Sequence, residues 1–249
     1  MSSFLKELKA YTNTDGFVGN TPCAGSGRTG DNMLMFSAEA FLVLKDNWMY
    51  NHPTAARSTA VSMINLIPKV TFPSGWFSRY TVDTDIGWDL TPDNLLGYLT
   101  LCTKEQANAL VEHLHMYDGM VTITFDKEGF TPYRQPQLYF AMLAVAGRLS
   151  RFNPIHIALA IWTALVIIEA GWNKPSTEDQ DARRLSYLLI RLVETRSFLC
   201  KLASKIWWQR LKKDYGYEGL RLVYTRYFLN PNHPIARWAL NVWDLPNNN

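Results

Sequence analysis

The longest apolar stretch of the chain, residues 154–172, has no polar stripe at either the helical or the strand period, and between positions 157 and 168 only Thr163 is not apolar. Pro154 suits a first helical turn, and Gly171 suits the residue just past a last turn. A helix that is apolar on all sides is either buried on all sides or surrounded by lipid. These twelve residues would span roughly 18 Å, less than the ~30 Å hydrocarbon core of a bilayer. The pattern therefore predicts the central helix of a large core and not a membrane span.

Most other apolar segments also follow the helical period, and several begin at a helix-start signal. Asp31 precedes one of them, and a carboxylate at that position accepts hydrogen bonds from the unpaired N–H groups of a first turn. The triplet Pro92-Asp93-Asn94 opens another segment in the same way. Helices are expected over residues 1–12, 31–44, 54–67, 92–102, 105–117, 135–150, 154–172, 219–228 and 234–243.

Two further segments complete the expected elements. Residues 176–215 contain no Gly or Pro, and one straight helix of that length would measure roughly 60 Å, which is long for a compact domain of this size. One helix and two helices broken near Thr195-Arg196-Ser197 are both compatible with the pattern. Residues 120–134 alternate in polarity around a Gly-containing turn and predict one small β-hairpin.

The order of these elements defines the fold class. No alternation of strands and helices occurs, so the chain is expected to be all-α, with helical hairpins packed as a partial or complete α/α toroid beside the one β-hairpin. A length of 249 residues with 47% hydrophobic and 19% charged residues suits one globular domain. We expect a single domain over residues 1–249, with an irregular N-terminal segment at 1–30 and a frayed tail at 244–249.

The net charge of +3 conceals two halves of opposite sign. Residues 1–125 hold 8 Lys and Arg against 12 Asp and Glu, whereas residues 126–249 hold 17 against 10. This asymmetry favours contacts between the halves, or an acidic site facing a basic one. Basic residues line residues 183–213; a solvated face is the first explanation, and an anionic partner or nucleic-acid backbone contact is the alternative. Because no dense basic run occurs, nucleic acid is not the expected partner.

The cysteines and the N-terminus limit the compartment and the chemistry. Cys23, Cys102 and Cys200 are far apart and odd in number, and no Cys-x-x-Cys or Cys/His spacing is present, so neither a disulfide framework nor a zinc site is expected. No cofactor is expected either. The N-terminal residues lack the apolar core and cleavage pattern of a secretion signal. These features predict a cytoplasmic or virion-associated protein that does not enter a membrane.

Short internal repeats suggest stacked helical hairpins. Gly30-Asp31-Asn32 and Thr91-Pro92-Asp93-Asn94-Leu95-Leu96-Gly97 both place Asp-Asn at the start of an apolar helix, and His-Pro follows Asn at positions 51 and 232. With Tyr227-Phe228 through His233-Pro234, these segments resemble the α/α toroids of glycan-processing enzymes, in particular uncharacterised phage and bacterial members. The resemblance spans Gly30 to Trp243. It implies a sugar hydrolase, a lyase or a non-enzymatic relative, and the chain is short for a complete ring of six hairpins.

Glycoside hydrolysis uses two carboxyl groups about 5–9.5 Å apart. Asp31 and Asp93 stand at equivalent helix starts, which a toroid would bring to one rim, and they are the first candidates for acid, base or nucleophile. Glu39 lies inside an apolar helix, so it stands either on its wet edge or at a cleft wall. The alternative for both Asp residues is simple helix capping, which is worth ~1 kcal/mol each.

The loop between these helices carries the expected substrate contacts. Trp76 and Trp88 could stack on a sugar face, with Asp89 beside them, or they could be core residues. The same loop holds an acidic cluster at Asp83, Asp85 and Asp89, which suits either a solvated loop or Ca²⁺ but lacks the spacing of an EF-hand. No metal site is predicted. The leading hypothesis is therefore a glycan-active or glycan-binding protein whose partner is an oligosaccharide.

A second hypothesis explains the same composition without catalysis. The chain has nine Trp, twelve Tyr and twelve Phe, and aromatic and basic surfaces are typical of protein contacts. A structural or assembly protein, for example a component of a phage particle, would use such surfaces to bind its neighbours. The two hypotheses differ in whether Asp31 and Asp93 share an open cleft.

Overall fold

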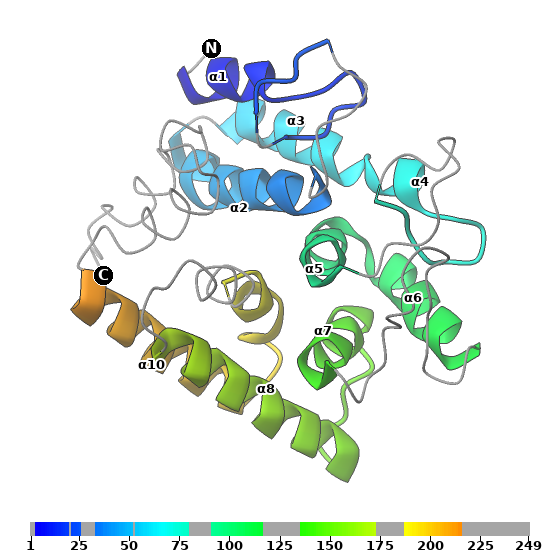
Figure 1. The fold of residues 1–249 in the computed structure, drawn as a ribbon, viewed down its shortest axis with the longest axis vertical. Helices are drawn as coiled ribbons and strands as arrows, with labels where there is room; N and C mark the ends of the chain where they lie inside the picture. Colours follow the sequence, from blue (N-terminus) through cyan, green and yellow to red (C-terminus); the bar gives the residue numbers. More distant parts are fainter. Residues whose placement is uncertain are drawn as a thin grey trace.

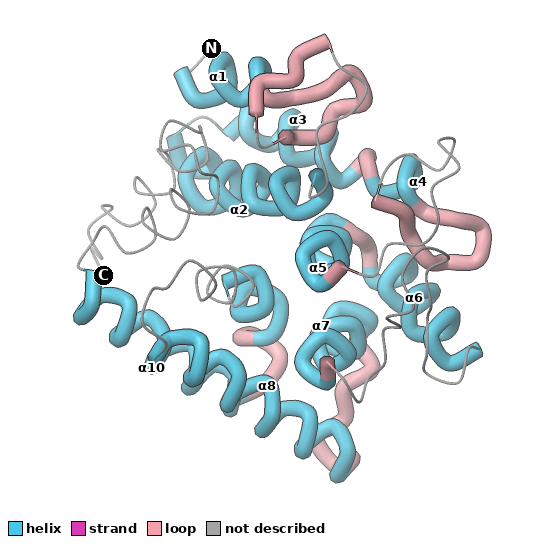
Figure 2. Tube along the Cα trace, in the orientation of Figure 1, coloured by secondary structure: helices cyan, strands magenta, loops and turns pink. Residues whose placement is uncertain are grey.

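We describe the protein from a computed structural model. The structure describes residues 3–19, 21–25, 33–51, 53–79, 91–116, 135–172 and 187–215. Within these ranges the chain is mostly helical, and its only β-pairings are two isolated bridges (Figure 2). The labelled helices are α1 (Ser3–Ala10), α2 (Met33–Asn51), α3 (Pro53–Ile64), α4 (Ile67–Val70), α5 (Pro92–Leu101), α6 (Lys104–Met116), α7 (Pro136–Ala146), α8 (Pro154–Trp172) and α10 (Phe198–Tyr215). The all-α class is confirmed for this part of the chain.

Three helices form the interior of the described structure. α2, α5 and α7 lie in the middle of the view, with α1 and α3 beyond α2, α4 and α6 to the right, and α8 and α10 beyond α7 (Figure 1). α5 packs against both α2 and α7, and α7 also packs against α6 and α8. Residues 33–40 of α2 and 94–99 of α5 are buried at every position. Helices that are apolar all round belong in such a position, because neighbours cover every face.

α2 and α5 approach each other closely at Gly97. A Cβ atom added to this glycine would lie only 2.6 Å from the carbonyl carbon of Leu34 and 2.6 Å from the backbone nitrogen of Met35. The missing side chain thus allows the backbones of the two helices to touch. This contact sets the crossing point of α2 and α5, in the first turn of α2 and the middle of α5.

A tight turn that occurs twice, 59 residues apart, precedes these two helices. Gly16 and Gly75 both have positive φ, at 100° and 91°, which glycine adopts without strain. The N–H of Asn13 donates to the carbonyl of Phe17, and the N–H of Phe72 donates to that of Trp76, both at 2.9 Å. The isolated bridges close the two turns: Thr12 pairs with Val18, and Thr71 with Phe77.

The hydrogen bonds around the two turns also match. The Thr12 hydroxyl donates to the carbonyl of Leu8 at 2.8 Å, and the Thr71 hydroxyl donates to that of Ile67 at 2.7 Å. The aromatic side chain after each glycine, Phe17 or Trp76, is fully buried. The same 59-residue offset relates the first residues of α2 and α5. Each turn and the inner helix that follows it therefore form one structural unit, and the described residues contain two successive copies.

α8 has the predicted bounds, Pro154–Trp172, but the prediction that it is buried on all sides is wrong. Ile161 is 48% exposed, Trp162 51% and Leu165 57%. Only the opposite face, with Thr163, Ile167 and its neighbours, is buried against α7 and α10. Apolar composition alone does not distinguish an enclosed helix from one with an uncovered apolar face, and the enclosed helices here are α2 and α5.

Other boundaries differ from the predictions in smaller ways. α2 continues to Asn51 instead of ending near 44. The predicted helix 54–67 divides into α3 and α4, with Pro68 in the first turn of α4. The long region breaks at 194–197, where the two alternatives had been equal. The predicted β-hairpin at 120–134, the helices after 216 and the tail lie outside the described residues.

Candidate functional site

The first turn of α5 holds the predicted carboxylate Asp93, although not in the predicted role. Thr91 occupies the N-cap position, and Asp93 follows inside the first turn, where it is half-buried. Asn94 is fully buried and donates from Nδ2 to the Thr91 hydroxyl at 3.2 Å. The interpretation of Asp93 as the helix cap is therefore wrong. Its negative charge still faces the positive end of the helix dipole, which favours it.

The crossing at Gly97 relates this turn to the start of α2. Asp93 lies four residues before Gly97, about one helical turn. Asp31 lies three residues before Leu34, the residue that Gly97 contacts, and is itself outside the described residues. The contact thus relates the first turn of α5, which carries Asp93, to the first turn of α2. Polar residues buried in the same two helices are Ser37, Glu39 and Asn94.

Glu39 does not stand on a wet edge of α2, because it is fully buried. Every described neighbour from Met33 to Ala40 is buried as well, so this helix presents no exposed face over that range. A carboxylate enclosed in this way is more costly to bury than any other side chain of the helix. Glu39 therefore belongs to the interior between the inner helices and does not line an open groove.

Trp76 is also fully buried, and its ring has no face exposed to a ligand. Its centroid lies 5.7 Å from that of Phe77 and 5.4 Å from that of His113. The Nδ1 atom of His113 lies 3.1 Å from the carbonyl oxygen of Ser74, in the turn that carries Trp76. This packing favours the core role of Trp76 over the sugar-stacking role. Trp88, Asp83, Asp85 and Asp89 lie outside the described residues.

The described side chains offer little for two other kinds of chemistry. No group of three or more His, Cys, Asp or Glu residues that could hold a metal ion occurs among them. Burial raises the pKa of the three thiols, to about 12 for Cys102. Since the thiolate is the nucleophile, none of these cysteines is activated for attack at neutral pH.

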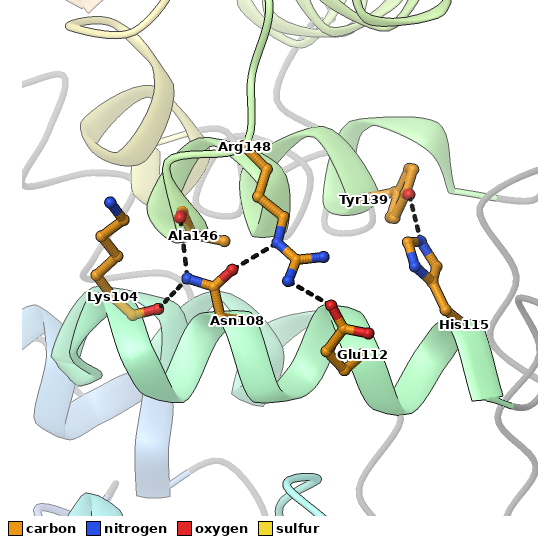
Figure 3. A network of polar contacts seen from close by, with 7 residues as sticks. All are labelled: Lys104, Asn108, Glu112, His115, Tyr139, Ala146 and Arg148. Carbon is orange, nitrogen blue, oxygen red and sulfur yellow. Dashed lines mark hydrogen bonds and ion pairs between the residues drawn. The ribbon is translucent and has the colours of Figure 1, made fainter.

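A polar network joins α6 to α7 (Figure 3). Asn108 donates from Nδ2 to the carbonyl of Ala146 at 3.1 Å and accepts from Nε of Arg148 at 2.5 Å. Arg148 also forms an ion pair with Glu112, and His115 hydrogen-bonds the hydroxyl of Tyr139 at 2.9 Å. Because these contacts satisfy the C-terminal end of α7 and hold it against α6, the network is an interhelical clamp. The sequence alone does not reveal this clamp, since the partners are 24 to 40 residues apart.

A second candidate surface lies on α8 and α10, which run side by side along one edge of the molecule (Figure 1). Large apolar residues are exposed on both helices, whereas elsewhere in the described chain such residues occur singly. Contiguous apolar surface of this kind marks a site of association. The exposed members are Ile155, Ile157, Ile161, Trp162 and Leu165 on α8, and Phe198, Leu199 and Leu202 on α10.

Comparison with known protein families, with characterised proteins and with solved structures found no match. The function of the chain must therefore be inferred from its own residues and geometry.

Proposed function

We propose that the protein is a glycan-active or glycan-binding helical-repeat protein whose site lies where α2 and α5 begin. The observation that carries this proposal is the backbone contact between Gly97 and Leu34-Met35. It joins the first turn of α2 to α5, and Asp93 lies four residues before Gly97, about one helical turn. Asp31 lies three residues before Leu34 in the sequence, and it would complete the pair of carboxyl groups that hydrolysis of a glycosidic bond requires.

The repeated turn supports a toroid as the arrangement of the complete chain. Gly16-Phe17 precedes α2 and Gly75-Trp76 precedes α5, each in the same turn and at the same offset from its helix. Units that place one inner helix and one or two outer helices in turn generate a ring or a solenoid. In a ring the starts of the inner helices meet at one rim, and the proposed site lies there.

The two carboxylates would have different tasks. The positive end of the α5 dipole favours a negative charge on Asp93, so Asp93 suits the base or the nucleophile. Asp31 would supply the second carboxyl group of the pair. Glu39, which is enclosed in α2, would support the positions of these groups and would not contact the sugar.

A test compares three proteins on a panel of polysaccharides. Release of reducing ends is measured for the wild type, Asp93→Asn and Asp31→Asn, with affinity electrophoresis on the same polysaccharides to detect binding. We expect each variant to lose at least ~100-fold in rate and to retain binding, because the side chains keep their size. A binding protein without activity would bind in the gel and release nothing. No binding and no release by the wild type would contradict the proposal.

A second candidate function is a structural or assembly protein, and one observation favours it. The exposed apolar side chains of α8 and α10 form a surface of the composition that protein contacts use. A role in assembly is compatible with a glycan site, since the exposed apolar surface lies on α8 and α10 and not on the inner helices α2, α5 and α7. Site-specific photocrosslinking from position 165, with position 116 on α6 as the control, would show whether the surface is occupied in the producing cell.

A further inference from the structure

The exposed face of α8 carries a regular stripe. Ile155, Ala158, Trp162 and Leu165 are all exposed, and their spacings of three, four and three residues keep them on one side of the helix. Spacings that alternate between three and four residues are those of a seam on which another helix packs. The buried side of α8, with Ala160, Thr163 and Ile167, faces the opposite way. The stripe is therefore a helix-packing surface without a described neighbour.

The stripe ends in two exposed charges of opposite sign. Arg151 lies four residues before Ile155, and Glu169 lies four residues after Leu165. Arg151 lies in the turn three residues before the first residue of α8, and Glu169 lies inside the helix near its C-terminal end. Both charges are unfavourable to the helix dipole, which prefers an acid near the N-terminus and a base near the C-terminus. Across an antiparallel copy the arrangement is favourable, since each acid meets a base.

The spacing of the six residues is the same read in either direction. An antiparallel copy centred level with Ala160 pairs every position of the stripe in one register. The smallest side chain, Ala158, then lies opposite the largest, Trp162, and Ile155 lies opposite Leu165. In the same register the turn that carries Arg151 lies beside the end of the second α8 that carries Glu169, so one axis satisfies both packing and charge.

A membrane is a poorer occupant of this surface. By length and composition the 18 residues Pro154–Gly171 could cross a bilayer, and 33% of them are buried in the structure. However, α10 runs alongside in the same direction: the Cys200 thiol lies 3.9 Å from the carbonyl of Ala160, and a Cβ on Gly171 would lie 3.3 Å from the Cα of Trp207. The exposed Lys201 and Lys205 are thus level with the middle of α8. A spanning α8 would place both ammonium groups in hydrocarbon.

We propose that the α8 stripe is a homodimer interface, in which two copies pack their α8 helices antiparallel about a two-fold axis level with Ala160. Trp162 fills the gap over Ala158 of the second copy, and Arg151 pairs with Glu169 of the second copy at both ends. Phe198 and Leu202 are exposed on α10, the helix that packs against α8. The dimer is independent of the proposed glycan site, because it uses only α8 and α10.

The test uses charge reversal in single and mixed samples, with mass measured by analytical ultracentrifugation over a range of concentrations. Arg151→Glu alone and Glu169→Arg alone each create two like-charge pairs in the dimer, and we expect the dissociation constant to rise at least ~10-fold. An equimolar mixture of the two variants restores two opposite-charge pairs in a mixed dimer. We expect its dissociation constant to return to within about threefold of the wild-type value.

Apolar substitutions complete the experiment. Trp162→Ala should weaken the dimer by at least ~10-fold, whereas Met116→Ala, at an exposed apolar position on α6, should leave it unchanged. Circular dichroism melting of each variant confirms that it is folded. A wild type that stays monomeric at all concentrations, or a mixture that fails to recover, overturns the proposal. Flotation of monomeric wild type with anionic vesicles, lost in Trp162→Ala, would also overturn it in favour of a lipid surface.

Discussion

At the scale of single residues, Gly97 has the largest structural effect of any described glycine. A helical glycine is ordinarily a weakness, and its replacement by alanine stabilises a helix by about 1 kcal/mol. Here the missing Cβ is the condition for the contact between α5 and α2, since the added atom would be 2.6 Å from backbone atoms that cannot rotate away. The helices would have to separate along a buried interface.

Gly97→Ala is therefore predicted to destabilise the protein. We expect the free energy of unfolding to fall by about 1–3 kcal/mol, the usual cost of overpacking a core, in urea denaturation followed by circular dichroism. The sign is the decisive result. An increase in stability, as for a helical glycine in open space, would mean that α2 and α5 do not touch at this position.

His113 gives a prediction about pH. Its ring is fully buried beside Trp76, and burial lowers its pKa below the ordinary value of about 6.5. The unfolded chain then binds the proton at a higher pH than the folded chain does. The stability contribution of neutral His113 is thus complete above pH ~6.5 and is lost as the pH falls through the lowered pKa.

The measurement is the melting temperature between about pH 7.5 and pH 5. We expect it to fall with decreasing pH in the wild type and to fall less in His113→Gln. Met116→Gln, at an exposed position without a titrating group on the same helix, is the control and should keep the wild-type slope. A slope that is the same in all three proteins would contradict the assignment to His113.

At the scale of elements, replacing an isoleucine of α8 by aspartate should have a small effect on the exposed face and a large effect on the buried face. Ile161 is 48% exposed and Ile167 is fully buried, on the same helix. Ile161→Asp should change the free energy of unfolding of the monomer by no more than about 0.5–1 kcal/mol, as expected for a surface site. Ile167→Asp buries an unpaired charge and should prevent folding. Loss of soluble protein for both variants would show that α8 is enclosed on all sides.

The bounds of the helices could be predicted from the sequence, whereas their surroundings could not always be predicted. The bounds of α5 and α8 follow from Pro92 and Pro154, and Asn153 accepts from the N–H of Ile155 at 2.9 Å as a cap should. Periodicity identifies such helices because it depends on local spacing alone. The exposure of the α8 stripe could not be predicted, because an interface and a core have the same composition. A clue was present in the mirrored positions of Arg151 and Glu169.

At the scale of the whole molecule, the internal repeat could also be predicted from the sequence only in part. The Asp-Asn pairs suggested repetition, but the stronger signal is the turn Thr-x-x-x-Gly-aromatic at Thr12 and Thr71. Three of the six positions of this motif accept different residues, so the sequence alone does not show that the two turns are equivalent. The shared positive φ of their glycines and their matching hydrogen bonds show it. The candidate site was predicted only in part: Asp93 lies in the expected first turn, whereas Trp76 and Glu39 are interior residues.

The distance between the carboxyl groups of Asp31 and Asp93 tests the proposed glycan site most directly. A crystal structure that resolves both side chains would measure it. If the starts of α2 and α5 form one site, the two groups lie about 5–9.5 Å apart on a surface open to solvent, and the value also distinguishes a retaining from an inverting mechanism. A separation of more than about 12 Å, or both carboxylates sealed by backbone N–H groups, would contradict it.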